Sequence, residues 1–162
     1  MRLTFDLIRH DPEVFRGLTG LLPSVFESIA AEVRPRFEAA DRARLDRPGR
    51  RRAIGAGRRY ELDATDQAFL ALVWLRHTLK HAALGHLFGV SEWTAMRAVG
   101  RMLPLLEATG RCRAPVPPPA RCRRKGLDTL LQDFPRLARF VRPASPGAAP
   151  PRIFPFAERG RG

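Results

Sequence analysis

Apolar residues recur at steps of three and four along the first part of the chain, which is the spacing of amphipathic helices. Asp11 followed by Pro12 is a typical N-cap and first helical position, and it predicts a short helix that ends near Leu18. A longer helix is predicted next, and Pro35 is a point where it can kink or split. Its apolar face consists of Phe26, Ile29, Ala30, Val33, Phe37 and Ala40.

A second apolar block follows residue 62, where Asp63 or Thr65 can cap a new helix. If this helix continued far enough, His77 and His81 would share one face, but the glutamate of an HExxH motif is missing after His77. We therefore predict structural or exposed histidines and no metal site. The wide apolar face of the block predicts a core element, formed by Phe69, Leu70, Leu72, Val73 and Trp74.

The stretch "LGHLFGVSEWTAMRAVGRML", residues 84–103, has the pattern of two helices joined by a tight turn. Gly89 can take the positive φ that ends the first helix, and Ser91 can cap the second. This is the arrangement of a helix-turn-helix, whose second helix docks in the major groove of DNA. The residues expected to be buried between the helices are Leu84, Phe88, Val90, Ala95 and Val99.

The second helix of this motif has two contrasting faces. Small and apolar residues form the inner face: Ala95, Ala98, Val99, Met102 and Leu106. Trp93, Arg97 and Arg101 follow at four-residue steps on the other face. Arg97 can pair with guanine or a phosphate, and Glu92 can accept from cytosine or only favour the helix N-terminus. The alternative is an ordinary helical hairpin, with Trp93 in the core and Arg97 solvated.

Positive charge is concentrated in two segments of the 162-residue chain, whose 29 Lys+Arg and 16 Asp+Glu give a net charge of +13. Residues 34–59 hold 10 bases and 3 acids, and residues 111–162 hold 12 and 3. The remaining, mostly helical, residues are near neutral. Basic arms on a neutral body favour a polyanionic partner such as nucleic acid, although a solvated surface in an arginine-biased proteome gives the same composition.

The first of these segments contains a stretch rich in arginine and glycine, with Arg50, Arg51, Arg52, Arg58 and Arg59. It lacks the Gly-Lys-Ser/Thr ending of a phosphate-binding P-loop. Flexible backbone beside guanidinium groups could follow a DNA backbone or enter a minor groove, and a basic linker would have the same composition.

Together these patterns predict an all-α fold, a small helical bundle that contains a helix-turn-helix, with basic arms and a disordered C-terminal tail. The expected divisions are an N-terminal helical segment (1–46), an Arg/Gly-rich arm (47–62), the helix-turn-helix domain (63–110), a Pro/Arg-rich linker (111–126) and a short helix followed by the disordered tail (127–162).

The sequence gives no sign of a membrane protein or of a bound cofactor. No signal peptide is visible, and the longest apolar run, residues 68–75, is too short to span a bilayer. Cys112 and Cys122 lack zinc-ligand spacing and are expected to be incidental thiols. We therefore expect a cytoplasmic, nucleoid-associated protein with no cofactor and no membrane contact.

Beyond these patterns, "RPGRRRAIGAGRRYEL" followed by "LALVWLRHTLKHAALGHLFGVSEWTAMRAVGRMLPLLE" resembles the N-terminal region of bacterial insertion-sequence transposases with a DDE catalytic domain. The resemblance covers roughly residues 10–138 and implies a helix-turn-helix that binds the element's terminal DNA. Ser91, Thr94 and Arg97 match the usual recognition-helix pattern of that family. Trp93 and Met96 depart from it, because small polar residues are commoner there, and this leaves the base preference open.

The family's catalytic part is expected to be missing from this chain. "LLQDFPRLA" resembles the lead-in to the catalytic domain, but "RFVRPASPG" follows in place of a strand with the first catalytic Asp. We therefore expect a DNA-binding protein without catalytic residues, whose partners are double-stranded DNA and either a second copy or a full-length transposase. The alternatives are the first reading frame of a transposase completed by frameshift fusion, and a helix-turn-helix transcriptional regulator.

Overall fold

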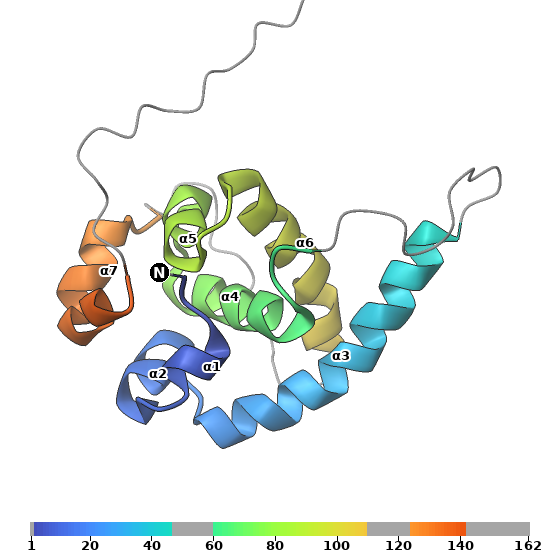
Figure 1. Cartoon of the computed structure of the whole chain (residues 1–162), viewed down its shortest axis with the longest axis horizontal. Helices are drawn as coiled ribbons and strands as arrows, with labels where there is room; N and C mark the ends of the chain where they lie inside the picture. Colours follow the sequence, from blue (N-terminus) through green and yellow to red (C-terminus); the bar gives the residue numbers. More distant parts are fainter. Residues whose placement is uncertain (1, 47–59, 110–123, 142–162) are drawn as a thin grey trace, which may run out of the picture.

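The computed structural model describes residues 2–46, 60–109 and 124–141, and this part of the chain is all-α, as predicted (Figure 1). The described residues form no β-strand, and an isolated parallel β-bridge joins Leu79 to Lys125. The elements are α1 (Phe5–Ile8), α2 (Pro12–Thr19), α3 (Pro23–Leu45), α4 (Ala64–His77), α5 (His81–Phe88), α6 (Glu92–Ala108), α7 (Leu127–Asp133) and the 3-10 helix η1 (Pro135–Arg139). None of these helices combines the length and the hydropathy needed to cross a bilayer.

The helix ends follow the capping residues in the sequence. Asp11 accepts a hydrogen bond from the Val14 amide at 3.3 Å, and α2 ends at Gly20 with a φ of +81°. Of the two caps predicted for α4, Asp63 is the one used, and it accepts from the Asp66 amide at 2.7 Å. Local side-chain chemistry therefore sets where these helices begin.

The long helix α3 is continuous through Pro35, so the predicted kink does not split it. Five of the six residues of its predicted apolar face are buried, but Ala40 is exposed. The reason is visible in Figure 1, where the C-terminal end of α3 projects beyond α6. The apolar pattern therefore continues past the part of α3 that the helical body covers.

Helix α4 lies at the centre of the core and is covered by its neighbours on most sides. Phe69 has no exposed surface, and its ring centroid lies 5.3 Å from that of Phe15 on α2 and 5.3 Å from that of Phe88 on α5. Leu70, Leu72 and Val73 are buried as predicted. Trp74 is only partly buried, because its ring stacks on His81 at the edge of the core.

The N-terminal segment is fixed to α4 and α5 by polar contacts. The Asp66 carboxylate, largely buried, accepts a hydrogen bond from the Phe5 amide at 2.9 Å and pairs with Arg2 at 3.3 Å. Leu3 donates its amide to the Leu87 carbonyl at 3.0 Å. These bonds place the first described residues beside the end of α5.

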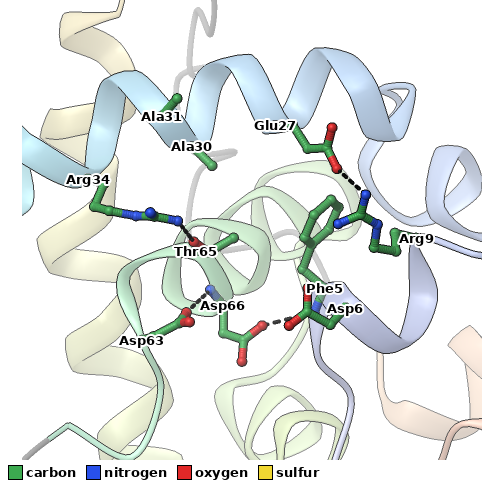
Figure 2. Close-up of a pocket in the computed structure, with 10 residues that line it drawn as sticks. All are labelled: Phe5, Asp6, Arg9, Glu27, Ala30, Ala31, Arg34, Asp63, Thr65 and Asp66. Carbon is green, nitrogen blue, oxygen red and sulfur yellow. Dashed lines mark hydrogen bonds and ion pairs between the residues drawn. The ribbon is translucent and has the colours of Figure 1, made fainter.

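A polar hollow lies between α1, α3 and the start of α4 (Figure 2). Across it Arg34 donates to the Thr65 hydroxyl at 3.1 Å, and nearby Arg9 pairs with Glu27 at 2.9 Å. These two contacts tie α3 to α1 and α4.

His77 and His81, which would share a face of one continuous helix, belong to different helices. Helix α4 ends at Thr78, which has a left-handed φ of +47°, and His81 begins α5. His77 is buried; its Nε2 donates to the Gly17 carbonyl at 3.2 Å and its ring lies edge-on to Phe134. This is the structural role that the sequence predicted for one of the pair.

Residues 124–141, the last part of the chain that the structure describes, pack beside His77. The single short helix predicted here is two elements, because α7 stops at Phe134 and η1 starts at Pro135, whose ring cannot continue a helix. Lys125 pairs with Asp133 at 2.9 Å and accepts the Lys80 amide on its carbonyl at 3.0 Å. The segment is therefore attached to the start of α5.

We expect stability to decline in mild acid because of His77. Burial lowers the pKa of His77 below its ordinary value of 6.5. The unfolded chain therefore takes up a proton first, so the stability contributed by His77 is present above about pH 6.5 and is lost as the pH falls towards the folded-state pKa. Thermal unfolding followed from pH 8 to 5 measures this slope.

In the variant His77→Gln, the side-chain amide can still donate to Gly17 but does not titrate. Its unfolding midpoint should depend less on pH between 7 and 5 than that of the parent. The pKa of His81 is also lowered, mainly by burial, so a smaller slope should remain until His81 is replaced too. Equal slopes in parent and variant would contradict the assignment.

Candidate nucleic-acid interface

The predicted helix-turn-helix is present as α5, a short turn and α6. Helix α5 ends at Gly89, which has a φ of +62°, as predicted for the turn glycine. The Val90 amide then donates to the Gly85 carbonyl at 2.9 Å, which satisfies a carbonyl at the helix end. Left-handed backbone at Gly89 therefore redirects the chain towards α6.

Gly85 is a second glycine that this motif needs, and the sequence analysis did not single it out. A Cβ atom at this position would lie 2.7 Å from the Val90 carbonyl oxygen and 3.2 Å from the Glu92 nitrogen. Only glycine therefore lets the turn pass so close to α5. The sequence feature that could have indicated this role is a glycine four residues before Gly89, inside an otherwise helical pattern.

Ser91 caps α6 as predicted, and its hydroxyl accepts from the Thr94 amide at 3.1 Å. The hydroxyls of Ser91 and Thr94 are also 2.9 Å apart and share a hydrogen bond. Both residues were predicted to contact DNA. The structure gives them a capping role at the start of α6, which leaves each hydroxyl further hydrogen-bonding capacity.

The inner face of α6 is buried as predicted. Ala95, Ala98, Met102 and Leu106 have no exposed surface, and Val99 is nearly as buried. Small side chains here let α6 pack closely against α4 and α5, which are its main neighbours. Val90, predicted to be buried as well, is only partly so, because the turn leaves one of its sides open.

The outer face of α6 is exposed at its N-terminal end in the part of the chain that the structure describes. Glu92, Trp93 and Arg97 are exposed, and Trp93 keeps 67% of its surface accessible. Met96, one turn from Trp93, keeps 40%. No salt bridge joins Arg97 to an acid within residues 2–46, 60–109 and 124–141. The alternative of a core Trp93 is therefore wrong.

Arg101 differs from the other two residues predicted for the outer face. Its guanidinium carbon lies 4.4 Å from the centre of the Tyr60 ring, and its Nε is buried without a hydrogen-bond partner. Such a cation–π contact holds α6 against the segment before α4. A DNA contact by Arg101 stays a prediction, and it would use the remaining guanidinium nitrogens.

Tyr60 links this contact to α3. Its hydroxyl donates to Asp41, and Arg44 donates to the same carboxylate at 2.8 Å. Burial alone would raise the pKa of Asp41, but the hydrogen bonds from Tyr60 and Arg44 lower it. The carboxylate is therefore the stable form, and it joins α3 to Tyr60.

The five arginines predicted to contact DNA from the arm, Arg50, Arg51, Arg52, Arg58 and Arg59, lie outside the described residues. The predicted linker and the tail beyond residue 141 also fall outside them for the most part. Of the predicted arm, residues 60–62 are described and join the helical body: Leu62 is buried, and its carbonyl accepts from the Gln67 side chain at 2.9 Å.

The part of the chain that the structure describes contains no grouping of three or more His, Cys, Asp or Glu side chains that could hold a metal ion. Comparison with known protein families places the helix-turn-helix of the DDE superfamily endonucleases on residues 60–112, which cover α4, α5 and α6. No curated protein and no solved structure matches the chain. This match confirms the expected resemblance of this region to the helix-turn-helix of DDE-type enzymes.

Proposed function

We propose that this chain binds double-stranded DNA by placing α6 in the major groove, and that its specific target is the terminal DNA of an insertion sequence. The family assignment of residues 60–112 supports DNA binding. The observation that carries the proposal is the exposed outer face of α6, where Trp93 and Arg97 are accessible beside a capped helix N-terminus. In helix-turn-helix proteins this part of the second helix meets the base edges.

Each part of the helix-turn-helix has a definite task in this proposal. The α5–α6 packing fixes the angle at which α6 leaves the body, and Gly85 and Gly89 let the turn pass close to the end of α5. Arg97 then carries a positive charge towards the groove, where it can make a bidentate pair with guanine. The amides at the start of α6, together with the Ser91 hydroxyl, can hold a phosphate at the groove edge.

We further infer that the chain binds DNA without cutting it. Strand transfer by a DDE enzyme needs three carboxylates that hold two metal ions. The acids after the linker are Asp128, Asp133 and Glu158. Asp133 pairs with Lys125, Asp128 lies at the start of the seven-residue helix α7, and Glu158 lies outside the described residues. This arrangement favours a structural role for the two described acids.

Selection from a pool of random duplexes tests the proposal. The purified chain should enrich one common motif over successive rounds, because a helix in the major groove discriminates between bases by about 1–3 kcal/mol per good contact. The same preparation with Mg²⁺ or Mn²⁺ should leave supercoiled plasmid uncut. Retention of DNA without any enriched motif would limit the chain to non-specific binding and contradict the proposed target.

A further inference from the structure

The outer face of α6 exposes two large apolar side chains that the body leaves uncovered. Trp93 and Met96 keep 67% and 40% of their surface accessible, and they are separated by one helical turn. Arg97 and Gly100 continue the same stripe at the spacing of four and three residues, and both are exposed. The stripe Trp93–Met96–Arg97–Gly100 is hereafter the outer stripe.

Gly100 leaves the helix backbone uncovered within this stripe. It sits inside α6, where glycine is less favourable than alanine because it loses more backbone freedom on folding. Its φ is not positive, and a Cβ atom built on it would meet no atom within 4 Å. Pro104 stands four residues later in α6 and cannot donate an amide to the Gly100 carbonyl, so a glycine here can ease the local distortion of the helix. It also leaves the helix backbone open to a partner that comes close.

We propose, resting on the DNA-binding function above, that the outer stripe reads thymine through its C5-methyl group. Trp93 and Met96 would cover the methyl group, Arg97 would pair with a neighbouring guanine or phosphate, and Gly100 would let the groove wall approach α6. Thymine is the base whose major-groove edge carries an apolar group, so it matches an exposed apolar pair. The charge of Arg97 and the positive end of α6 favour DNA over an apolar protein surface.

Two other ways of covering this surface would give different experimental results. A second copy of the chain would bury Trp93 and Met96 in a dimer, so removal of Trp93 would change the molecular mass in solution. An aromatic wedge between base pairs would depend on unstacking and would be indifferent to a methyl group. Of the three kinds of contact, only contact with thymine depends on the methyl group itself.

Replacing thymine by deoxyuridine tests the proposal, because it removes the methyl group and keeps every hydrogen-bonding atom. The probe is the duplex enriched from the random pool, with each thymine exchanged in turn. At one or two positions the affinity should fall roughly fourfold, the equivalent of about 0.8 kcal/mol per buried carbon group. Trp93→Ala should bind the thymine and deoxyuridine duplexes equally.

The controls separate this proposal from the one on which it rests. Leu22→Ala removes a similarly exposed apolar side chain at the start of α3, and it should keep the preference for thymine. If the parent enriches no motif from the pool, the proposed function fails. If it enriches one and no thymine exchange lowers its affinity, the thymine contact is wrong while DNA recognition stands. A dimer that Trp93→Ala dissociates would also overturn the proposal.

Gly100→Ala gives a readout that a purely structural role cannot imitate. In the free protein the substitution should raise the unfolding midpoint, because alanine favours the helix and the space around Gly100 is open. The same variant should bind the enriched duplex several-fold more weakly, because its methyl group lies where the groove wall approaches. A variant that is more stable and binds with undiminished affinity would contradict the close approach.

Discussion

Replacing Phe69 with alanine is expected to lower the free energy of unfolding by about 3–5 kcal/mol. Phe69 has no exposed surface, and its ring contacts those of Phe15, Phe26 and Phe88 at centroid distances of 5.3, 6.1 and 5.3 Å. Truncation would leave a cavity and would remove aromatic contacts of about 0.5–1.5 kcal/mol each, and these losses are already part of the first figure. Since small proteins are stable by about 5–15 kcal/mol, this variant should be close to unfolding.

Chemical denaturation of the variant measures this loss, with Leu22→Ala as the matched control. Leu22 is 49% exposed, so its truncation should change the free energy of unfolding by less than about 0.5 kcal/mol. The effect of Phe69→Ala on DNA binding should follow unfolding alone and disappear when the temperature is lowered. A loss below about 1 kcal/mol would mean that the core around α4 closes over the missing ring.

The sequence predicts those features of the helix-turn-helix that depend on neighbouring residues. Ser91 and Asp63 cap helices because a side-chain oxygen one or two bonds beyond Cβ reaches an amide three residues ahead. Gly89 ends α5 because glycine alone takes a positive φ without cost. The spacing of Ala95 and Val99 predicts the inner face of α6. Each of these inferences needs only a few residues of local sequence.

Features that depend on distant partners could not be predicted in this way. Arg101 has the spacing of an outward-facing residue, but Tyr60, 41 residues earlier, takes up its guanidinium. Ala40 continues an apolar pattern but is exposed within the described residues, because the pattern does not say where the neighbouring helices end. Thr78 ends α4 in a left-handed conformation, which the sequence does not signal in a residue branched at Cβ.

The second large effect concerns the separate contributions of α6 and of the arginines of residues 47–59 to DNA binding, for which we propose distinct roles. Arg97 provides sequence preference, and Arg50, Arg51, Arg52, Arg58 and Arg59 provide attraction to phosphates. Arg97→Ala should lower the ratio of affinities for enriched and random duplexes by about 5–150-fold, which corresponds to about 1–3 kcal/mol. It should change the salt dependence little.

Replacing the five arginines together should weaken binding to both duplexes alike. Each phosphate contact releases counterions, so its loss should flatten the slope of log affinity against log salt by about 0.9, and loss of all five by up to about 4.5. Titrations of both duplexes at several salt concentrations measure the two quantities separately.

Arg16→Ala is the control for the loss of a single positive charge. Arg16 is exposed on α2, which lies across the molecule from α6 in Figure 1, so its removal should leave both the affinity ratio and the slope close to those of the parent. The proposal would be contradicted if Arg97→Ala kept the ratio of affinities for enriched and random duplexes while the five-arginine variant lowered that ratio to about one. Recognition would then have to be assigned to the arginine- and glycine-rich segment, because a charge that only attracts phosphates cannot distinguish one duplex from another.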